Sequence, residues 1–182
     1  MILTESEEAT ARTEYNRMLS EFAKFCGLQN PKKYDEWYRR GAIDFPKLLE
    51  VDGVVSVGVD WEQNRIIVLT EMVIAFDKRD ARKELGEYIV FLDPFNKTFT
   101  FENVTGGAES SCGTYMYPHP HIHYDGEMCI TTGRMEIITA MIDARYSISM
   151  TVIMAALRMR YNEGTFEGPY ITLERWPTKE LE

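Results

Sequence analysis

The sequence predicts an α+β fold, in which helices near both ends of the chain pack against an antiparallel sheet. Three observations lead to this prediction: apolar residues near the N-terminus recur at helical spacing, those in the middle alternate with polar residues, and an apolar helical segment follows residue 145. This order of elements is typical of α+β proteins. Because no linker rich in Pro, Gly or Ser divides the 182 residues, we expect a single domain over 1–182.

The first helix is predicted to begin at a capping box formed by Thr4 and Glu7 and to end at Gly27. Six residues between them recur at steps of three and four and so share one face: Tyr15, Met18, Leu19, Phe22, Phe25 and Cys26. A second, short helix is expected over 34–40, and Pro46 is expected to end this region before the sheet.

Four strands of an antiparallel meander are expected next. In the first, the apolar side chains of Val55, Val57, Val59 and Trp61 alternate with Ser, Gly and Asp, which predicts one buried face. The second strand lies within 65–76, the third over 87–92 and the fourth around Phe99 and Phe101. The unbroken apolar run in 88–92 predicts burial on both faces.

The connections between these strands carry turn-forming or charged residues. Turns are expected at 62–64 and 93–96, where Asn, Asp and Pro gather. The segment 77–84 is almost entirely charged, so we expect a solvated loop or a short surface helix there. The segment 105–113 is rich in Gly, Ser and Ala and is expected to be an exposed loop.

A second long helix is predicted over 146–161, after a short apolar segment at 137–142. Ser147 or Ser149 is the expected cap, and Asn162, Glu163 and Gly164 are the expected stop. The face expected to cover the sheet consists of Ile148, Val152, Ala155, Ala156 and Met159.

Charge and cysteine content exclude several classes of function. A formal charge of −9 and a pI near 4.9 argue against nucleic acid or an anionic membrane surface as the partner. The three cysteines, Cys26, Cys112 and Cys129, are widely spaced and predict neither a disulfide framework nor a Cys-x-x-Cys metal site. A reducing cytoplasm is the expected location, because the sequence shows no secretory signal and no run of about 20 apolar residues.

All three histidines lie in one short segment beside Cys129. The segment runs His119-Pro120-His121-Ile122, passes through an Asp-Gly step, and ends in Gly126-Glu127-Met128-Cys129-Ile130. It resembles the core of ubiquitin-conjugating enzymes, the UBC-like family, whose pattern is His-Pro-Asn-Ile followed by a turn, Gly, a hydrophobic residue, Cys and a further hydrophobic residue. The family places its Asn eight positions before its Cys, which is the separation of His121 from Cys129.

The resemblance covers about 5–165, leaves 166–182 as a tail, and implies a UBC-like fold with an active-site loop and C-terminal helices. It implies that Cys129 receives a ubiquitin-like modifier as a thioester from an adenylating (activating) enzyme and passes it to an amine or thiol of a protein substrate. No metal or organic cofactor is needed. By the same resemblance, His119 fixes the loop through hydrogen bonds, and Glu163, Glu167 and Asp125 are candidates for binding and shaping the exit side of the site.

One departure from the family concerns the reaction itself. His121 occupies the position of the Asn that stabilises the oxyanion, a change associated with divergent bacterial and phage relatives. An imidazole at this position is able to donate to the oxyanion, tune the thiol of Cys129, or accept a proton from the incoming amine. Other departures are the missing proline-rich run, of which Tyr117-Pro118 remains, and the missing Trp after the Cys, for which Tyr146 is the nearest substitute.

Two alternative functions follow from the same residues. His119, His121 and His123 alternate, so on a segment that Pro120 keeps extended they would share one side and bind zinc, with Asp125 or Cys129 completing four ligands. The second alternative is a non-catalytic UBC-like module that binds other proteins, because one fold serves many functions.

Overall fold

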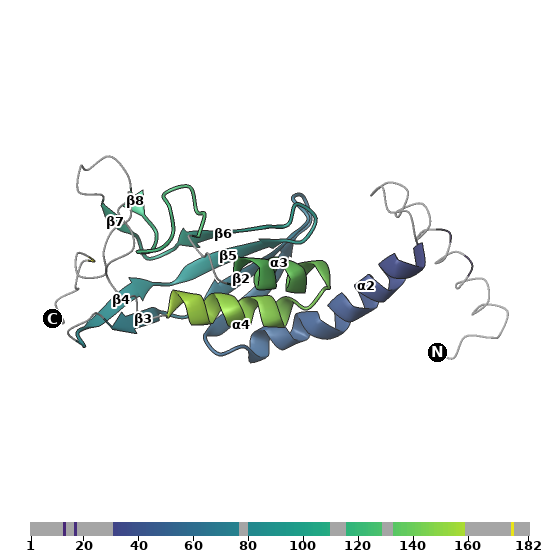
Figure 1. The fold of residues 1–182 in the computed structure, drawn as a ribbon, viewed down its shortest axis with the longest axis horizontal. Helices are drawn as coiled ribbons and strands as arrows, with labels where there is room; N and C mark the ends of the chain where they lie inside the picture. The colour runs from purple at the N-terminus through teal and green to yellow at the C-terminus, as the bar shows by residue number, and fades with distance from the viewer. Residues whose placement is uncertain are drawn as a thin grey trace. The chain divides into compact units, whose positions relative to one another are not determined.

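A computed structural model describes the chain over Thr13, Arg17, 31–76, 80–109, 116–128, 133–158 and Trp176 (Figure 1). The chain divides into two compact units, Met1–Ile43 and Asp44–Glu182, and each is described by itself. The expectation of a single domain stays a prediction.

In the first unit, Thr13 and Arg17 are helical, and a further helix, α2 (Pro31–Asp44), continues into the first residue of the second unit. The capping box and the apolar face predicted for the first helix lie outside the described residues. Helix α2 is longer at both ends than the predicted 34–40. It continues through Gly41, a residue that costs a helix up to about 1 kcal/mol relative to Ala and therefore looks like a stop in the sequence.

The second unit contains the four-stranded antiparallel sheet that the sequence predicts. A 3-10 helix, η1 (Phe45–Glu50), leads into the sheet. Pro46 lies in the first turn of η1 and does not end the helical region as predicted. The strands are β1 (Val54–Asp60), β2 (Arg65–Thr70), β5 (Tyr88–Asp93) and β6 (Thr98–Asn103), in the order β1-β2-β5-β6. The predicted turns at 62–64 and 93–96 are confirmed, and in the second the Asp93 carboxylate accepts the backbone N–H groups of Phe95 and Asn96 at 3.0 and 2.8 Å.

Along β2, β5 and β6 one face of this sheet is largely buried, and the other is half-buried or exposed. Val68 pairs with Val90, and Val90 pairs with Phe101, so these side chains line one face together. Along β5, Tyr88, Val90 and Leu92 are completely buried, whereas the residues between them are not. The predicted burial of this strand on both faces is therefore wrong. Among the described elements of this unit, helices cover one face of the sheet only (Figure 1).

The first strand also departs from its predicted alternation. Val57 and Val59 are half-buried, but Val55 and Trp61 have 56% and 80% of their surface exposed. The pairing register of β1 shifts between Val54 and Ser56, which breaks the period of two at its start. Trp61 lies one residue beyond the strand, in the turn.

A second, two-stranded sheet is inserted between β2 and β5. It consists of β3 (Val73–Phe76) and β4 (Arg82–Gly86), paired antiparallel. The prediction of a loop or surface helix over 77–84 is thus wrong for 82–84. Trp176, which is 4% exposed, explains the difference: its indole N–H donates to the Glu84 carbonyl at 2.9 Å, and Lys83 Nζ donates to the Trp176 carbonyl at 3.4 Å.

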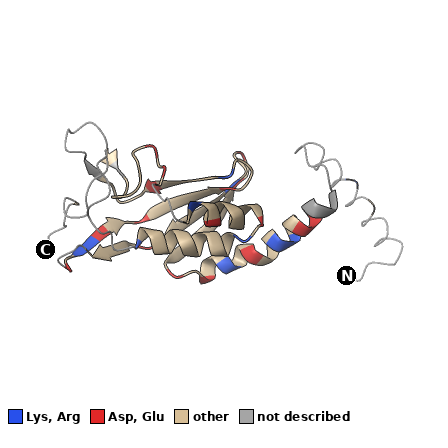
Figure 2. Cartoon of the chain, viewed as in Figure 1, with Lys and Arg blue, Asp and Glu red and all other residues tan. Residues whose placement is uncertain are grey.

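Two helices lie over the buried face of the main sheet, α3 (Arg134–Ile142) and α4 (Tyr146–Leu157) (Figure 1). The buried residues of α4 are Tyr146, Ser149, Met150, Ile153, Met154, Ala156 and Leu157. Of the predicted face, Ala156 is buried as expected, but the prediction is wrong for Ile148, Val152 and Ala155, which are exposed or half-buried. Met159 lies outside the described residues. Helix α4 carries no charged residue (Figure 2), so its sequence contains no charged stripe that would identify the covered face.

The start of α4 is capped from another part of the chain. The nearly buried carboxylate of Asp44 accepts both the backbone N–H and the hydroxyl of Ser147, each at 2.7 Å. Ser149 instead donates to the Ile137 carbonyl at 3.0 Å and joins the two helices. The predicted self-capping by Ser147 or Ser149 is wrong, and a negative charge at the helix N-terminus replaces it.

Within the described part of the chain, no helix combines the length and the apolar character that crossing a membrane requires.

Candidate functional site

The histidine segment begins with a β-turn. The backbone N–H of Ile122 donates to the His119 carbonyl at 3.0 Å, which closes a four-residue turn with Pro120 at its second position. Proline is favoured there because its ring fixes φ near the value that the turn needs. The stretch 119–122 is therefore a turn and not the extended segment that the zinc alternative assumes.

His119 holds this turn from inside the protein. Its side chain is completely buried, and its ring lies edge-on to Tyr88 with 5.8 Å between ring centroids. Nδ1 accepts the backbone N–H of His121 at 3.0 Å, and Nε2 lies 3.1 Å from the Leu157 carbonyl at the end of α4. Because Nδ1 is an acceptor, the ring proton is on Nε2 and is donated to Leu157.

Burial lowers the pKa of His119 from 6.5 to about 3; the bond to Leu157 opposes this shift, and the nearby His121 adds to it. The imidazole is therefore neutral at physiological pH. Since both ring nitrogens are engaged, neither has a lone pair to offer a metal ion. Consistently, the described residues contain no group of three or more His, Cys, Asp or Glu side chains placed to hold a metal ion.

A tight hairpin follows the turn. The backbone N–H of Gly126 donates to the His123 carbonyl at 2.9 Å, that of His123 donates to the Glu127 carbonyl at 2.8 Å, and Ile122 forms an antiparallel bridge with Met128. Gly126 has φ of +85°, a value that favours glycine. This confirms the turn that the Asp-Gly step predicts and has the hydrogen bonding of a hairpin with a glycine bulge.

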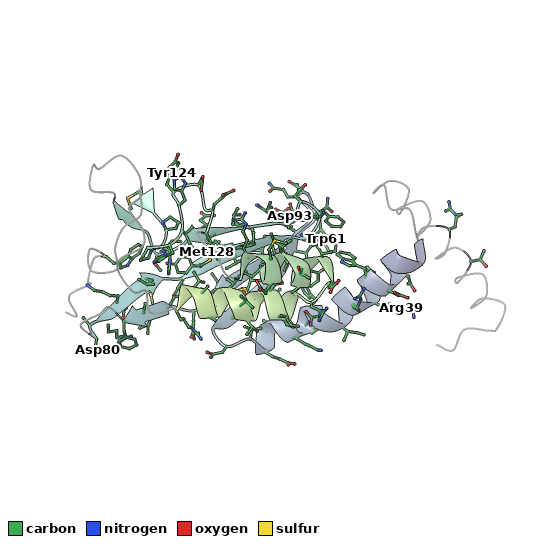
Figure 3. All side chains as sticks on the ribbon, viewed as in Figure 1. Arg39, Trp61, Asp80, Asp93, Tyr124 and Met128 are labelled. Carbon is green, nitrogen blue, oxygen red and sulfur yellow. The ribbon has the colours of Figure 1, made fainter. Side chains whose placement is uncertain are left out.

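The hairpin is attached to the edge of the main sheet. Phe101 in β6 donates its backbone N–H to the Gly126 carbonyl at 3.2 Å. A Cβ at position 126 would lie 2.9 Å from the Phe101 carbonyl oxygen, so only glycine permits this approach. Tyr124 projects from the tip of the loop, with 47% of its surface exposed, whereas Met128 is buried (Figure 3).

His121 is the third residue of the turn over 119–122 and is half-buried. Burial lowers its pKa from 6.5 to about 4. At neutral pH its ring is therefore uncharged, and it is a weak base that still carries one N–H donor. The ring centroids of His121 and His119 are 6.4 Å apart.

Asp125 and His123 form a pair at the exposed end of the hairpin. His123 Nδ1 lies 2.9 Å from the Asp125 carboxylate. The backbone N–H of Glu127, which donates to Asp125 at 3.0 Å, is the main cause that lowers the pKa of this carboxyl, and the contact with His123 lowers it further. Asp125 therefore stabilises the turn from within, a role independent of any ligand.

Two residues that sequence reasoning missed secure the start of the loop. The Pro118 carbonyl accepts the side-chain amide of Asn103 at 2.7 Å and the hydroxyl of Tyr88 at 2.8 Å. A tyrosine inside the apolar run 88–92 was the available signal, because a buried phenol needs a hydrogen-bond partner. Nothing in the sequence around Asn103 identifies the carbonyls that it reaches.

The structure thus brings together part of the predicted site. His119 and His121 are adjacent and hydrogen bonded, and His123 and Asp125 lie on the same hairpin. Cys129, Glu163 and Glu167 lie outside the described residues, as do Cys26 and Cys112.

Comparison of the chain with protein-family models, with curated proteins and with solved structures gives no match in any of the three.

Proposed function

We propose that this chain is a UBC-like conjugating protein of divergent prokaryotic or phage type, which carries a ubiquitin-like modifier as a thioester on Cys129. An adenylating enzyme supplies the modifier, and a lysine or cysteine of a protein substrate receives it. The motif from His119 to Ile130 and the α+β order of elements are the basis of this proposal.

The bridge between Ile122 and Met128 is the observation that carries the proposal. This bridge brings the residue after His121 beside Met128, which precedes Cys129 in the sequence. His121 and Cys129 have the eight-residue separation that the sequence shares with the family.

The proposed chemistry consists of two acyl transfers. The Cys129 thiolate attacks the carbonyl carbon of the donor thioester, a new C–S bond forms, and the donor thiolate leaves with the proton that Cys129 released. In the second step the acceptor amine attacks the same carbon, the C–S bond to Cys129 breaks, and the departing thiolate takes up the proton that the nitrogen loses as the amide forms. Each step passes through a tetrahedral oxyanion that needs a hydrogen-bond donor.

Among the three roles considered for His121, donation to the oxyanion fits best. A residue with a pKa of about 4 is a poor base at neutral pH, and it carries no charge with which to lower the pKa of a thiol. Its neutral imidazole still has one N–H group. A neutral donor is also what the family's Asn provides.

Ubiquitin carrying a C-terminal thioester of a small thiol provides a direct test, because it needs no activating enzyme. Incubation with the protein should give a covalent adduct that a reducing thiol removes. Cys129→Ser should give an oxyester that resists the reducing thiol, and Cys129→Ala should give no adduct. Intact mass measured with and without reductant distinguishes the three.

Cys112→Ala is the matched control, since it removes a different cysteine and should leave the adduct unchanged. An adduct that persists in Cys129→Ala contradicts the assignment of the nucleophile. If the wild-type chain forms no adduct, the conjugating function is wrong and the non-catalytic binding module takes its place.

A further inference from the structure

Two backbone carbonyls from distant parts of the chain converge beside the histidine loop. The Leu85 carbonyl comes from the end of β4, and the Pro118 carbonyl immediately precedes His119. Asn103 Nδ2 donates to both of them, at 2.7 Å each. The Tyr88 hydroxyl is placed to share its proton between the same two oxygens, at 3.0 and 2.8 Å. Without donors between them, two converging carbonyl dipoles would repel each other.

The orientation of the Asn103 amide is fixed from its other side. Oδ1 accepts the backbone N–H of Thr105 at 3.0 Å and the Thr105 hydroxyl at 2.9 Å. Both protons of Nδ2 and both acceptor sites of Oδ1 are thus used, which is the full hydrogen-bonding capacity of the side chain. A flipped amide would direct its oxygen at the two carbonyls and its NH2 group at the Thr105 backbone N–H, and would lose these three interactions.

The backbone leaves space for this amide at one specific position. A Cβ at Gly86 would lie 2.4 Å from Oδ1 and 2.5 Å from Nδ2 of Asn103. Gly86 also has φ of +124°, which favours glycine. The end of β4 is therefore shaped to admit the Asn103 side chain.

We propose that Asn103 and Tyr88 are positioning residues for the histidine loop, which hold Pro118 and thereby set the place of His121 relative to the main sheet. This inference rests on the proposed function for its catalytic consequence, but the position of the loop can be measured independently. Pro118 precedes His119, and the His119 ring accepts the backbone N–H of His121. A shift at Pro118 therefore moves His121 through His119.

The test replaces Asn103 with alanine and follows the ring of His121 by NMR as a function of pH. Asn103→Ala introduces no charge, so any change in the pKa of His121 reports its burial. We expect that pKa to rise by about one unit from its value of about 4, toward the ordinary 6.5, as the loop loosens. The rate of adduct formation with the ubiquitin thioester should fall about tenfold, because misplaced catalytic groups lose rate steeply.

Asn96→Ala is the matched control. It deletes the same side chain at the opposite end of β6, where Asn96 donates to Asp93 at 2.7 Å in an exposed turn. It should change neither the titration of His121 nor the rate. Tyr88→Phe keeps the ring and removes only the hydroxyl. It should raise the pKa of His121 and lower the rate of adduct formation, as Asn103→Ala does, and it replaces Asn103→Ala in the test if that variant does not fold.

A folded Asn103→Ala or Tyr88→Phe protein in which His121 titrates as in the wild type overturns the inference. If the wild-type protein forms no adduct, the proposed function fails, whereas the His121 titration still decides whether the two residues position the loop.

Discussion

His119 illustrates how one buried side chain organises a loop. Its ring accepts a hydrogen bond from His121 and donates one to Leu157, so it joins the loop to the end of α4. An alanine at this position would leave a buried N–H and a buried carbonyl without partners, at a cost of about 1 to 3 kcal/mol each. His119 therefore affects a reaction at this loop only indirectly, because it holds the backbone of His121 in place.

At His121 the proposed role predicts different outcomes for two substitutions. His121→Asn keeps a neutral N–H donor and should retain adduct formation within about tenfold of the wild type. His121→Ala removes the donor and should lower the rate about 100- to 1000-fold, the usual loss for one oxyanion donor. Single-turnover rates measured with the ubiquitin thioester compare them, and equal rates in the two variants would exclude the donor role.

Gly126→Ala should destabilise the protein through two effects that a control can separate. The substitution places a Cβ 2.9 Å from the Phe101 carbonyl and forces alanine to adopt φ of +85°. Gly106→Ala shares only the second effect, because φ there is +102° and no atom lies within 4 Å of the added Cβ. We expect a loss of about 1 kcal/mol for Gly106→Ala and about 1 to 3 kcal/mol more for Gly126→Ala, measured by urea unfolding. Equal losses would show that the contact with Phe101 is unimportant.

At the scale of elements, the hairpin formed by β3 and β4 depends on Trp176. The buried indole of Trp176 donates its N–H to the Glu84 carbonyl in β4. The backbone carbonyl of Trp176 accepts a hydrogen bond from the buried Lys83 side chain. Trp176→Phe keeps most of the apolar contact and removes the N–H donor. It should cost about 1 kcal/mol, against about 3 to 5 kcal/mol for Trp176→Ala.

Urea unfolding and amide exchange of β4 measure these losses. Trp61→Ala is the control, because Trp61 is 80% exposed and its truncation should change the free energy of unfolding by less than about 0.5 kcal/mol. Protection of the β4 amides that is unchanged in Trp176→Ala would show that Trp176 does not hold the hairpin.

The elements that sequence analysis predicted correctly are those with a local signal. The strands β2 and β6, the two turns of the main sheet and the Asp-Gly turn follow from alternation and turn chemistry within a few residues. The strand β4 did not follow, because the burial of Lys83 depends on Trp176, far along the chain. The cap of α4 was missed for the same reason, since Asp44 supplies it.

The same distinction applies to the site. The loop-fixing hydrogen bonds of His119 and the turn at Gly126 were predicted from the motif, whereas the donors that hold Pro118 come from β5 and β6 and have no counterpart in the local pattern. The buried face of α4 could not be predicted from its sequence, because the helix has no charged residue on any face. Packing against the sheet and α3 decides which face is buried.

For the molecule as a whole, burial of a neutral His119 predicts instability in acid. Between pH 6.5 and about 3, His119 is protonated in the unfolded chain but stays neutral in the folded protein. The free energy of unfolding therefore falls as the pH is lowered through this range. One such group contributes a slope of about 1.4 kcal/mol per pH unit. His121, whose pKa is lowered to about 4, acts in the same direction, as do Asp60 and Asp125, whose pKa values are also lowered in the folded protein.

His119→Gln separates the contribution of His119 from those of His121 and the carboxylates, because an amide can donate and accept but does not titrate in this range. The variant should unfold more easily than the wild type at pH 7 and show a shallower decline between pH 6.5 and 4. Urea unfolding at several pH values measures both slopes. Parallel slopes would show that His119 is not the group responsible.

The insertion of the small hairpin between β2 and β5 also bears on how the chain folds. These two strands are neighbours in the sheet, yet residues 71–87 separate them, so their pairing requires closure of a loop. Closing a loop costs entropy that grows with its length. Because β3 and β4 are adjacent in sequence, they can pair within microseconds and shorten the chain that must be closed. The hairpin thereby lowers the effective contact order of the central strand pair, which favours faster folding of the sheet on which the histidine loop is built.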